Sequence, residues 1–229
     1  MTMTKARVRT RTTSKQALID AALQLFYAKG FDGTSIRDIA GKAGINPANI
    51  AYHFKNKNGL LEFCVTQYLE GYTKILEKEM KKLESGRPDD CLFSILSGLI
   101  RYQSSNHIAA RFISREMTLE STLNREILTT YMAKEKHCFQ LVIEKGIEIG
   151  MFKRIAVPMF ILQLKGLLTA PVLHSPYAVE LLNFYPQDLY YAEKYEKHCR
   201  ALIGEMLLKD GYSHDLARIA DGFNRPAFG

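Results

Sequence analysis

Residues 34–60 read TSIRDIAGKAGINPANIAYHFKNKNGL and are the most informative stretch of this chain. They predict two short helices joined by a tight turn. Thr34 or Ser35 is a suitable N-cap for the first helix, and Gly44 can end it because glycine adopts the left-handed conformation without steric cost. Asn46 is a suitable N-cap for the second helix, with Pro47 in its first turn. This layout is typical of a DNA-binding helix-turn-helix.

The second of these helices is expected to run from Ala48 to about His53. Apolar spacing turns Ile50 and Phe54 inward and leaves Asn49 and Tyr52, together with His53, on or near the outer side. A helix this short is not stable alone in water. We therefore expect it to be packed on a scaffold that presents its outer side.

Basic residues are concentrated in the same region. Residues 1–60 carry 10 Lys and Arg against 3 acidic residues, and this excess equals the net charge of +7 of the whole chain. Residues 61–229 carry 21 basic and 21 acidic residues. An excess confined to one quarter of the chain indicates a localised contact with a polyanion. The alternative is a basic tail that only aids solubility.

Apolar residues recur at spacings of three and four, and no window alternates strictly, so the chain is predicted to be all-α. The chain has 229 residues and is 47% hydrophobic, which is enough for a sizeable core. Asn56 is expected to cap a long helix, and Asp89 or Asp90 the next one. Prolines limit 170–188 to one short helix at most. The longer helices are expected at about 14–29, 56–85, 90–105, 107–120, 122–149, 157–170 and 187–210.

The sequence argues against a membrane or secreted protein. The most apolar run, Val157–Leu173, contains Lys165 and two prolines and is too short to span a bilayer. The Arg-rich N-terminus lacks the apolar segment of a signal peptide. The four cysteines are far apart without a CxxC motif, which favours buried free thiols in a reducing compartment. A cytoplasmic location follows.

An enzyme is not expected. No HExxH, GxSxG or glycine-rich phosphate loop is present. The adjacent pairs His137–Cys138 and His198–Cys199 do not make ready metal sites, because neighbouring residues on a helix point about 100° apart. We predict no catalytic residues, no cofactor and no metal.

Residues 14–65 resemble the DNA-binding head of TetR-type regulators, most clearly in ALQLFYAKGFDGTSIRDIAGKAGINPANIAYHFKNKNGLL, which starts at Ala22. The resemblance implies a three-helix helix-turn-helix head followed by a helical-bundle body for dimerisation and ligand binding. The expected divisions are a flexible basic arm at 1–12, a DNA-binding domain at 13–57 and a dimerisation and regulatory domain at 58–229.

The resemblance also implies that the second helix of the motif enters the major groove of double-stranded DNA. The chain departs from the family at one point, because the common tyrosine is replaced by Ala51 and the aromatic residue follows as Tyr52. His53 is as suited to packing beside Phe54 as to touching DNA. Side chains expected to contact bases or phosphates are Thr34, Ser35, Arg37, Asn46, Ala48, Asn49, Ala51, Tyr52, His53, Lys55 and Lys57.

The body is expected to form a homodimer and to bind a small-molecule effector or a protein partner. By resemblance, the helices near 157–170 and 187–210 form the dimer interface, with the alternative that half of the candidates belong to the core of a single chain. The interface candidates are Met159, Phe160, Leu167, Tyr195, Cys199, Leu202, Ile203 and Met206. The pocket candidates are Tyr102, Phe112, Met117, Tyr131 and Phe139, which at helical spacing are equally compatible with a core.

Within the family, the GTSIRDIA segment, the aromatic end of the recognition helix and the later YLEGY are similar to the RefZ subgroup of spore-forming Bacilli. Two functions are therefore expected as alternatives. The first is a homodimeric transcriptional regulator at a palindromic or pseudopalindromic site. The second is a chromosome-bound regulator of cell division and septum placement during sporulation, which acts on a protein partner rather than on promoters. Both imply a nucleoid-associated protein.

Overall fold

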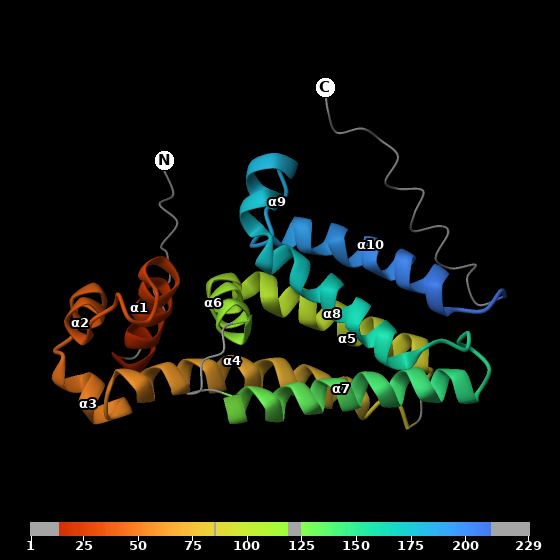
Figure 1. Ribbon diagram of the computed structural model, residues 1–229, viewed down its shortest axis with the longest axis horizontal. Coiled ribbons are helices and arrows are strands. Elements are labelled where there is room, and N and C mark those ends of the chain that lie inside the picture. Colours follow the sequence, from red (N-terminus) through yellow and green to blue (C-terminus); the bar gives the residue numbers. More distant parts are fainter. Residues whose placement is uncertain (1–13, 85, 119–124, 212–229) are drawn as a thin grey trace, which may run out of the picture. The chain divides into compact units, whose positions relative to one another are not determined.

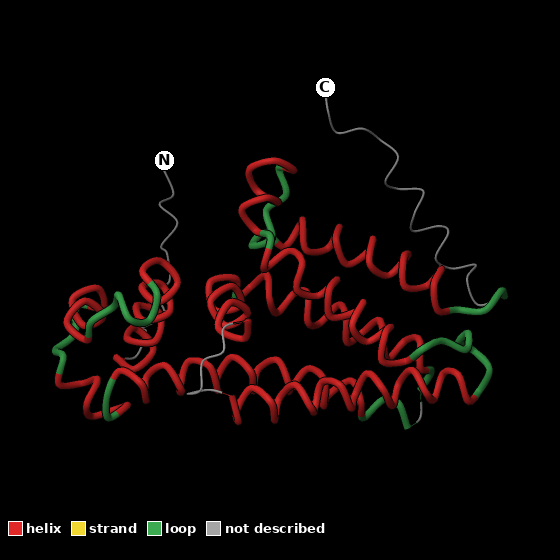
Figure 2. The backbone as a smooth tube through the Cα atoms, in the orientation of Figure 1, coloured by secondary structure: helices red, strands yellow, loops and turns green. Residues whose placement is uncertain are grey.

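The computed structural model describes residues 14–84, 86–118 and 125–211, with only the backbone at 116–118 and 125. Its regular elements in these ranges are α-helices (Figures 1 and 2), so the all-α prediction is confirmed. The described residues also contain one isolated antiparallel bridge, between Phe152 and Leu208. The chain divides between Val65 and Thr66 into two compact units.

The first unit contains α1 (Ser14–Lys29), α2 (Ile36–Ala43), α3 (Ala48–Phe54) and the start of α4 (Lys57–Met80). α1 has the predicted bounds and ends where Gly30 takes a φ of 76°. The short helices are held by the core that they share, because a helix of eight residues or fewer gains little from its own hydrogen bonds. This core includes Leu18, Ala22, Phe26, Ile39, Ile50, Phe54 and Leu60.

The turn between α2 and α3 follows from its capping residues. Ser35 is the N-cap of α2 and forms a capping box with Asp38. Gly44 ends α2 in the left-handed conformation. Asn46 bonds to the start of α3, since its Oδ1 accepts a hydrogen bond of 2.9 Å from the backbone N–H of Ala48, but the N-cap position is occupied by Pro47 rather than by Asn46. These local bonds fix the direction in which α3 leaves the turn.

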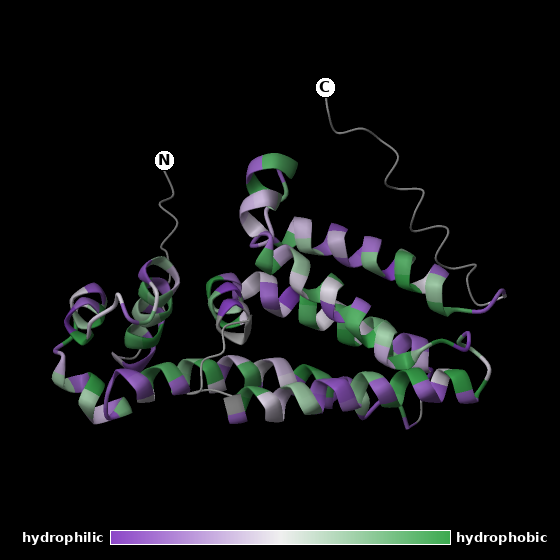
Figure 3. Cartoon of the chain, viewed as in Figure 1, coloured by the Kyte–Doolittle hydropathy of each residue, from purple (hydrophilic) through white to green (hydrophobic). Residues whose placement is uncertain are grey.

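The second unit contains the rest of α4 and six further described helices (Figure 1). α5 packs against α7 and α10, while α8 packs against α6 and α7. Apolar residues gather where these helices meet, as the hydropathy colouring in Figure 3 shows. The central core includes Leu92, Ile95, Leu99, Phe139, Val142, Leu164 and Ile203. The six helices are α5 (Pro88–Ser105), α6 (His107–Thr118), α7 (Arg125–Glu148), α8 (Val157–Leu173), α9 (Ser175–Leu182) and α10 (Leu189–Leu207).

Two predicted helix ends are wrong. α4 ends at Met80 rather than Ser85, because the next backbone bonds, such as Lys82 N–H to Glu79 O, are of the tighter i to i−3 type. The N-cap of α5 is Arg87 rather than an aspartate. Pro88 occupies the first turn, and Asp89 pairs with Arg87 at 2.6 Å instead of capping the helix.

α8 runs through Pro171 to Leu173, although this proline was expected to end it at 170. A proline lacks the N–H that would bond to the carbonyl four residues earlier, here that of Leu167. The hydroxyl of Tyr195 on α10 donates to this carbonyl at 2.8 Å. The acceptor left free by Pro171 is thus satisfied from a neighbouring helix, and the helix continues for its last residues.

Within the described ranges, no single helix combines the length and the apolar composition needed to cross a membrane. The pair α8 and α9, bent by 66° at the break between them, meets the criterion by length and composition. All four cysteines are free thiols; Cys64, Cys91 and Cys199 are buried, and Cys138 is partly exposed.

Candidate DNA-binding surface and ligand cavity

The outer side of α3 presents a small exposed surface around Tyr52. This side chain is 83% exposed, the largest value among the exposed large hydrophobic residues described. Its ring meets that of His53 edge to face, with ring centroids 4.9 Å apart. Ala48 and Ala51 are also exposed, whereas His53 is half-buried between Tyr52 and Phe54. An aromatic ring this open, beside two methyl groups, suits contact with base edges.

The two asparagines at the start of α3 have structural bonds. Asn46 uses its side-chain oxygen to accept from the backbone N–H of Ala48. Asn49 is half-buried, and its Nδ2 donates to the backbone oxygen of Asn46 at 3.2 Å. Asn49 keeps one further donor and its oxygen for other partners. The prediction that Asn49 contacts DNA therefore depends on these remaining groups.

One predicted phosphate contact, Thr34, needs correction, and a second, Lys57, has structural bonds but also lines the depression at the N-terminus of α2 and stays a prediction. The side chain of Thr34 is buried, and its hydroxyl donates to the Gly30 carbonyl at 2.8 Å, so it is not available to a phosphate. Lys57 is half-buried, and its Nζ donates to the carbonyls of Phe31 and Thr34, both at 3.0 Å. The ammonium also lies 4.2 Å from the ring centroid of Phe31. Both residues hold the loop between α1 and α2.

Ser35, Arg37 and Lys55 are exposed, as a phosphate contact requires. Ser35 and Arg37 line a shallow depression at the N-terminus of α2, where unpaired backbone N–H groups favour an anion. Hydrogen bonds from the backbone and hydroxyl of Ser35 lower the pKa of Asp38. Lys55 ends α3 with a φ of 68°, unusual for a residue other than glycine.

The basic excess of the described head is smaller than that of residues 1–60 as a whole. Residues 14–60 contain six Lys and Arg and three acidic residues. The other four basic residues belong to the predicted basic arm at 1–12, which lies outside the described residues.

The predicted dimer residues fall into three groups. Met159, Leu202 and Met206 are exposed and remain suited to an interface. Leu167 and Tyr195 are half-buried against the core of the single chain. Phe160, Cys199 and Ile203 are corrected, because all three are at most 4% exposed within this core. These three positions belong to the inner stripes of α8 and α10.

Further exposed apolar side chains were not among the predicted interface residues. They lie on α8, on α9 and at the start of α10. The prolines of 170–188 allowed at most one short helix there, so the apolar spacing of α9 gave little signal. Six such side chains are more than half exposed: Leu162, Tyr177, Leu181, Leu182, Leu189 and Tyr190.

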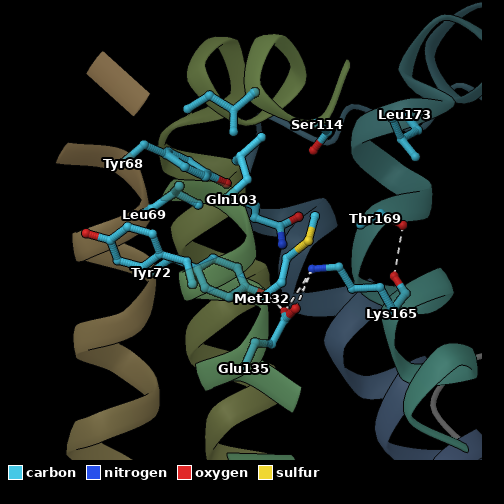
Figure 4. Close-up of a pocket in the computed structure, with 13 residues that line it drawn as sticks. Tyr68, Leu69, Tyr72, Gln103, Ser114, Met132, Glu135, Lys165, Thr169 and Leu173 are labelled. Atoms are coloured by element: carbon cyan, nitrogen blue, oxygen red, sulfur yellow. Dashed lines mark hydrogen bonds and ion pairs between the residues drawn. The ribbon is translucent and has the colours of Figure 1, made fainter. Parts of the chain in front are cut away.

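A cavity of about 250 Å³ lies within the second unit, and Figure 4 shows the residues that line it. Its wall is mostly apolar, and three helices contribute tyrosines or ionisable groups: α4, α7 and α8. The apolar and aromatic lining residues are Leu69, Ile113, Leu128, Met132, Leu173, Tyr68, Tyr72 and Tyr131. The polar ones are Gln103, Ser114, Glu135, Lys165 and Thr169.

Of the predicted pocket residues, only Tyr131 lines this cavity. Phe112 and Phe139 are corrected, because both are fully buried in the packing between helices. Tyr102 is corrected as well: its ring lies against Gly71, where no Cβ would fit, and its hydroxyl donates to the Tyr68 carbonyl at 2.8 Å. The side chain of Met117 lies outside the described residues.

Three of the lining residues, Tyr72, Glu135 and Lys165, form a hydrogen-bonded cluster that contains a carboxylate and an ammonium group (Figure 4). Lys165 Nζ lies 2.7 and 2.9 Å from the two carboxylate oxygens of Glu135. The hydroxyl of Tyr72 donates to the same carboxylate at 2.5 Å. Burial, and then the negative charge of Glu135, raise the pKa of Tyr72 well above its usual range. Sequence separations of 63 and 30 residues kept this cluster out of reach of motif analysis.

Among the described residues, no group of three or more His, Cys, Asp or Glu side chains is placed to hold a metal ion. The pairs His137–Cys138 and His198–Cys199 thus have no third ligand of these types in that part of the chain.

Comparison with known proteins identifies a family and a relative that matches most of this chain. Residues 18–64 match the family "Bacterial regulatory proteins, tetR family". The chain is 40% identical over 185 residues to the Bacillus subtilis (strain 168) protein described as "Probable HTH-type transcriptional regulator YttP". This alignment covers 81% of the present chain and 89% of that relative. The family expected from the head is confirmed, and the RefZ subgroup is not.

Solved structures extend the likeness to the whole fold. The TetR family transcriptional regulator PfmR from Thermus thermophilus superposes with a TM-score of 0.67 at 22% identity, covering 84% of this chain and 96% of PfmR. AibR, solved in complex with isovaleryl coenzyme A and operator DNA, gives a TM-score of 0.65 at 16% identity, covering 83% and 97%. At these identities the likeness is one of fold alone.

Proposed function

The chain belongs to the tetR family of bacterial regulatory proteins, and we infer from this premise that it regulates transcription as a homodimer bound to a palindromic or pseudopalindromic DNA site. The observation that carries the proposal is the exposed side of α3, with Tyr52 at its centre. This helix belongs to a helix-turn-helix in which both ends of α2 are capped and the start of α3 is bonded to Asn46. We place the protein in the cytoplasm at the nucleoid, where its target lies.

In the proposed complex, α3 enters the major groove. Tyr52 contacts a base edge, and the methyl groups of Ala48 and Ala51 approach thymine methyls. Arg37 and Lys55, with the N–H groups at the start of α2, contact phosphates, which position the protein without reading sequence.

Dimerisation is proposed through α8 and α10, extended by α9. The exposed Met159, Leu202 and Met206 are apolar surface that a second copy would cover. A two-fold symmetric pair presents two α3 helices, and a symmetric DNA site follows from that symmetry.

The cavity is proposed as the effector site. It is concave and mostly apolar, with a few convergent polar groups, which is the usual make-up of a small-molecule site. AibR supports the idea that this fold accommodates a ligand and operator DNA in one protein. We propose that a ligand in the cavity changes the affinity for DNA.

Mapping of binding sites across the genome tests the proposal. We expect symmetric sites in promoters for the native protein and weaker occupancy of the same sites for Tyr52→Ala. Binding confined to a few chromosomal landmarks away from promoters would instead favour the RefZ-like role in cell division, which we do not propose because the Bacillus subtilis relative is described as a transcriptional regulator.

A further inference from the structure

The cavity of the second unit contains an ammonium group, that of Lys165. The Lys165 ammonium pairs with Glu135 and lies 5.7 Å from the ring centroid of Tyr72. A carboxylate and an aromatic face around one ammonium group are the usual components of a site for an organic cation. Lys165 thus marks where such a cation would lie.

The two charged partners differ in how firmly they are held. The side chain of Glu135 is 9% exposed and is bonded from two sides, by Tyr72 and by Lys165. The side chain of Lys165 is 33% exposed and sits at the end of a flexible stem. Once another cation pairs with Glu135, the Lys165 ammonium can therefore move into water at little cost, whereas Glu135 stays buried.

This asymmetry selects the charge of the ligand. A cation could take the place of the Lys165 ammonium and leave the buried carboxylate paired. An anion would draw Lys165 away and leave Glu135 with Tyr72 alone, and an uncompensated buried charge is strongly unfavourable. The tyrosines Tyr68 and Tyr131 add further aromatic surface to the wall.

We propose that the cavity binds a compact organic cation, a protonated or quaternary amine with apolar groups, which replaces the Lys165 ammonium beside Glu135. A cavity of about 150 Å³ holds benzene, so the 250 Å³ here suits about ten non-hydrogen atoms. The inference rests on the proposed function only in taking this cavity as the effector site. Binding of the cation separates Lys165 on α8 from Glu135 on α7, which is the structural change available for regulation.

Calorimetric titration of the full-length protein with three probes tests the charge preference. The probes are benzyltrimethylammonium, neutral 3-phenylpropanol and anionic 3-phenylpropionate, which are similar in size. We expect the cation to bind at least about tenfold more tightly than the other two, corresponding to about 1.4 kcal/mol. No binding of benzyltrimethylammonium, or tighter binding of phenylpropionate, would overturn the proposal.

Three variants locate the site. Glu135→Gln should lose the preference for the cation, while Glu144→Gln, the same change at an exposed position of α7, should keep it. Lys165→Met removes the competing ammonium, so it should bind the cation more tightly and gain more thermal stability from it than the native protein does. If Glu135→Gln binds the cation as tightly as the native protein does, the cation does not bind beside Glu135 and the proposal is wrong. If Lys165→Met does not fold, comparison of cation binding by the native protein and by Glu135→Gln still tests the proposal.

Gel shifts with and without benzyltrimethylammonium separate this inference from the proposed function. Specific DNA binding combined with no cation binding would overturn the ligand class and leave the regulator intact. Cation binding by a protein that shows no specific DNA binding would support the ligand class and overturn the proposed function as a regulator.

Discussion

The head and the cavity differ in the distance along the chain over which their parts are assembled. The turn before α3 is built from Ser35, Asp38, Gly44 and Asn46, each bonded within five residues of itself. The cluster of Tyr72, Glu135 and Lys165 joins three helices through bonds between residues 63 and 30 positions apart. A surface assembled locally can be recognised from a motif, whereas a site assembled from distant helices needs the fold.

The strongest test of this difference is a core substitution in the head. Ile50 is fully buried, so Ile50→Ala should cost about 2–5 kcal/mol of head stability. If residues 13–57 form a separate domain, as we propose, DNA binding is lost while the body keeps its helices and its cation binding. Circular dichroism during thermal unfolding, together with titration of the probe, measures both. Simultaneous unfolding of the whole chain would contradict separate domains.

The next effect concerns sequence reading. Tyr52→Ala removes an 83% exposed ring that contacts nothing in the core, so the fold should be unchanged. Loss of one good base contact costs about 1–3 kcal/mol, and discrimination between specific and scrambled duplexes should fall accordingly. Competition gel shifts measure it, with Tyr52→Phe as the control that keeps the ring. Unchanged discrimination would remove Tyr52 from the reading surface.

A smaller effect is expected at the N-cap of α2. Ser35→Ala breaks the capping box with Asp38 and should cost about 1 kcal/mol. The thermal midpoint of the head should fall, which differential scanning calorimetry can measure. A loss of DNA affinity without any loss of stability would instead assign Ser35 to phosphate contact alone.

The smallest effect is expected at Lys55. Lys55→Ala should weaken binding to all duplexes alike and reduce the slope of log affinity against log salt by about 0.9. Lys42→Ala is the matched control, because Lys42 is an exposed lysine of the same head that is not among the residues expected to contact DNA. Equal slopes for the two variants would show that Lys55 does not contact a phosphate.

The sequence predicted the all-α class, the bounds of α1 and the cap residues of α2, because these depend on neighbours a few residues away. It misassigned Thr34, which the packing of the head buries, and it did not show the long-range bonds that Lys57 makes to the loop between α1 and α2. Apolar spacing also could not separate the buried Phe160 and Ile203 from the exposed Met159 and Met206. Each stripe has an inner and an outer edge, and only the packed helices distinguish them.

The bond from the Tyr195 hydroxyl to the Leu167 carbonyl links the identities of two positions 24 residues apart, 171 and 195. As long as position 171 is proline, this carbonyl depends on a donor from α10. A residue other than proline at 171 would supply its own N–H and release position 195 from the need for a hydroxyl. We therefore expect these positions to covary among relatives of this chain, with tyrosine at 195 accompanying proline at 171.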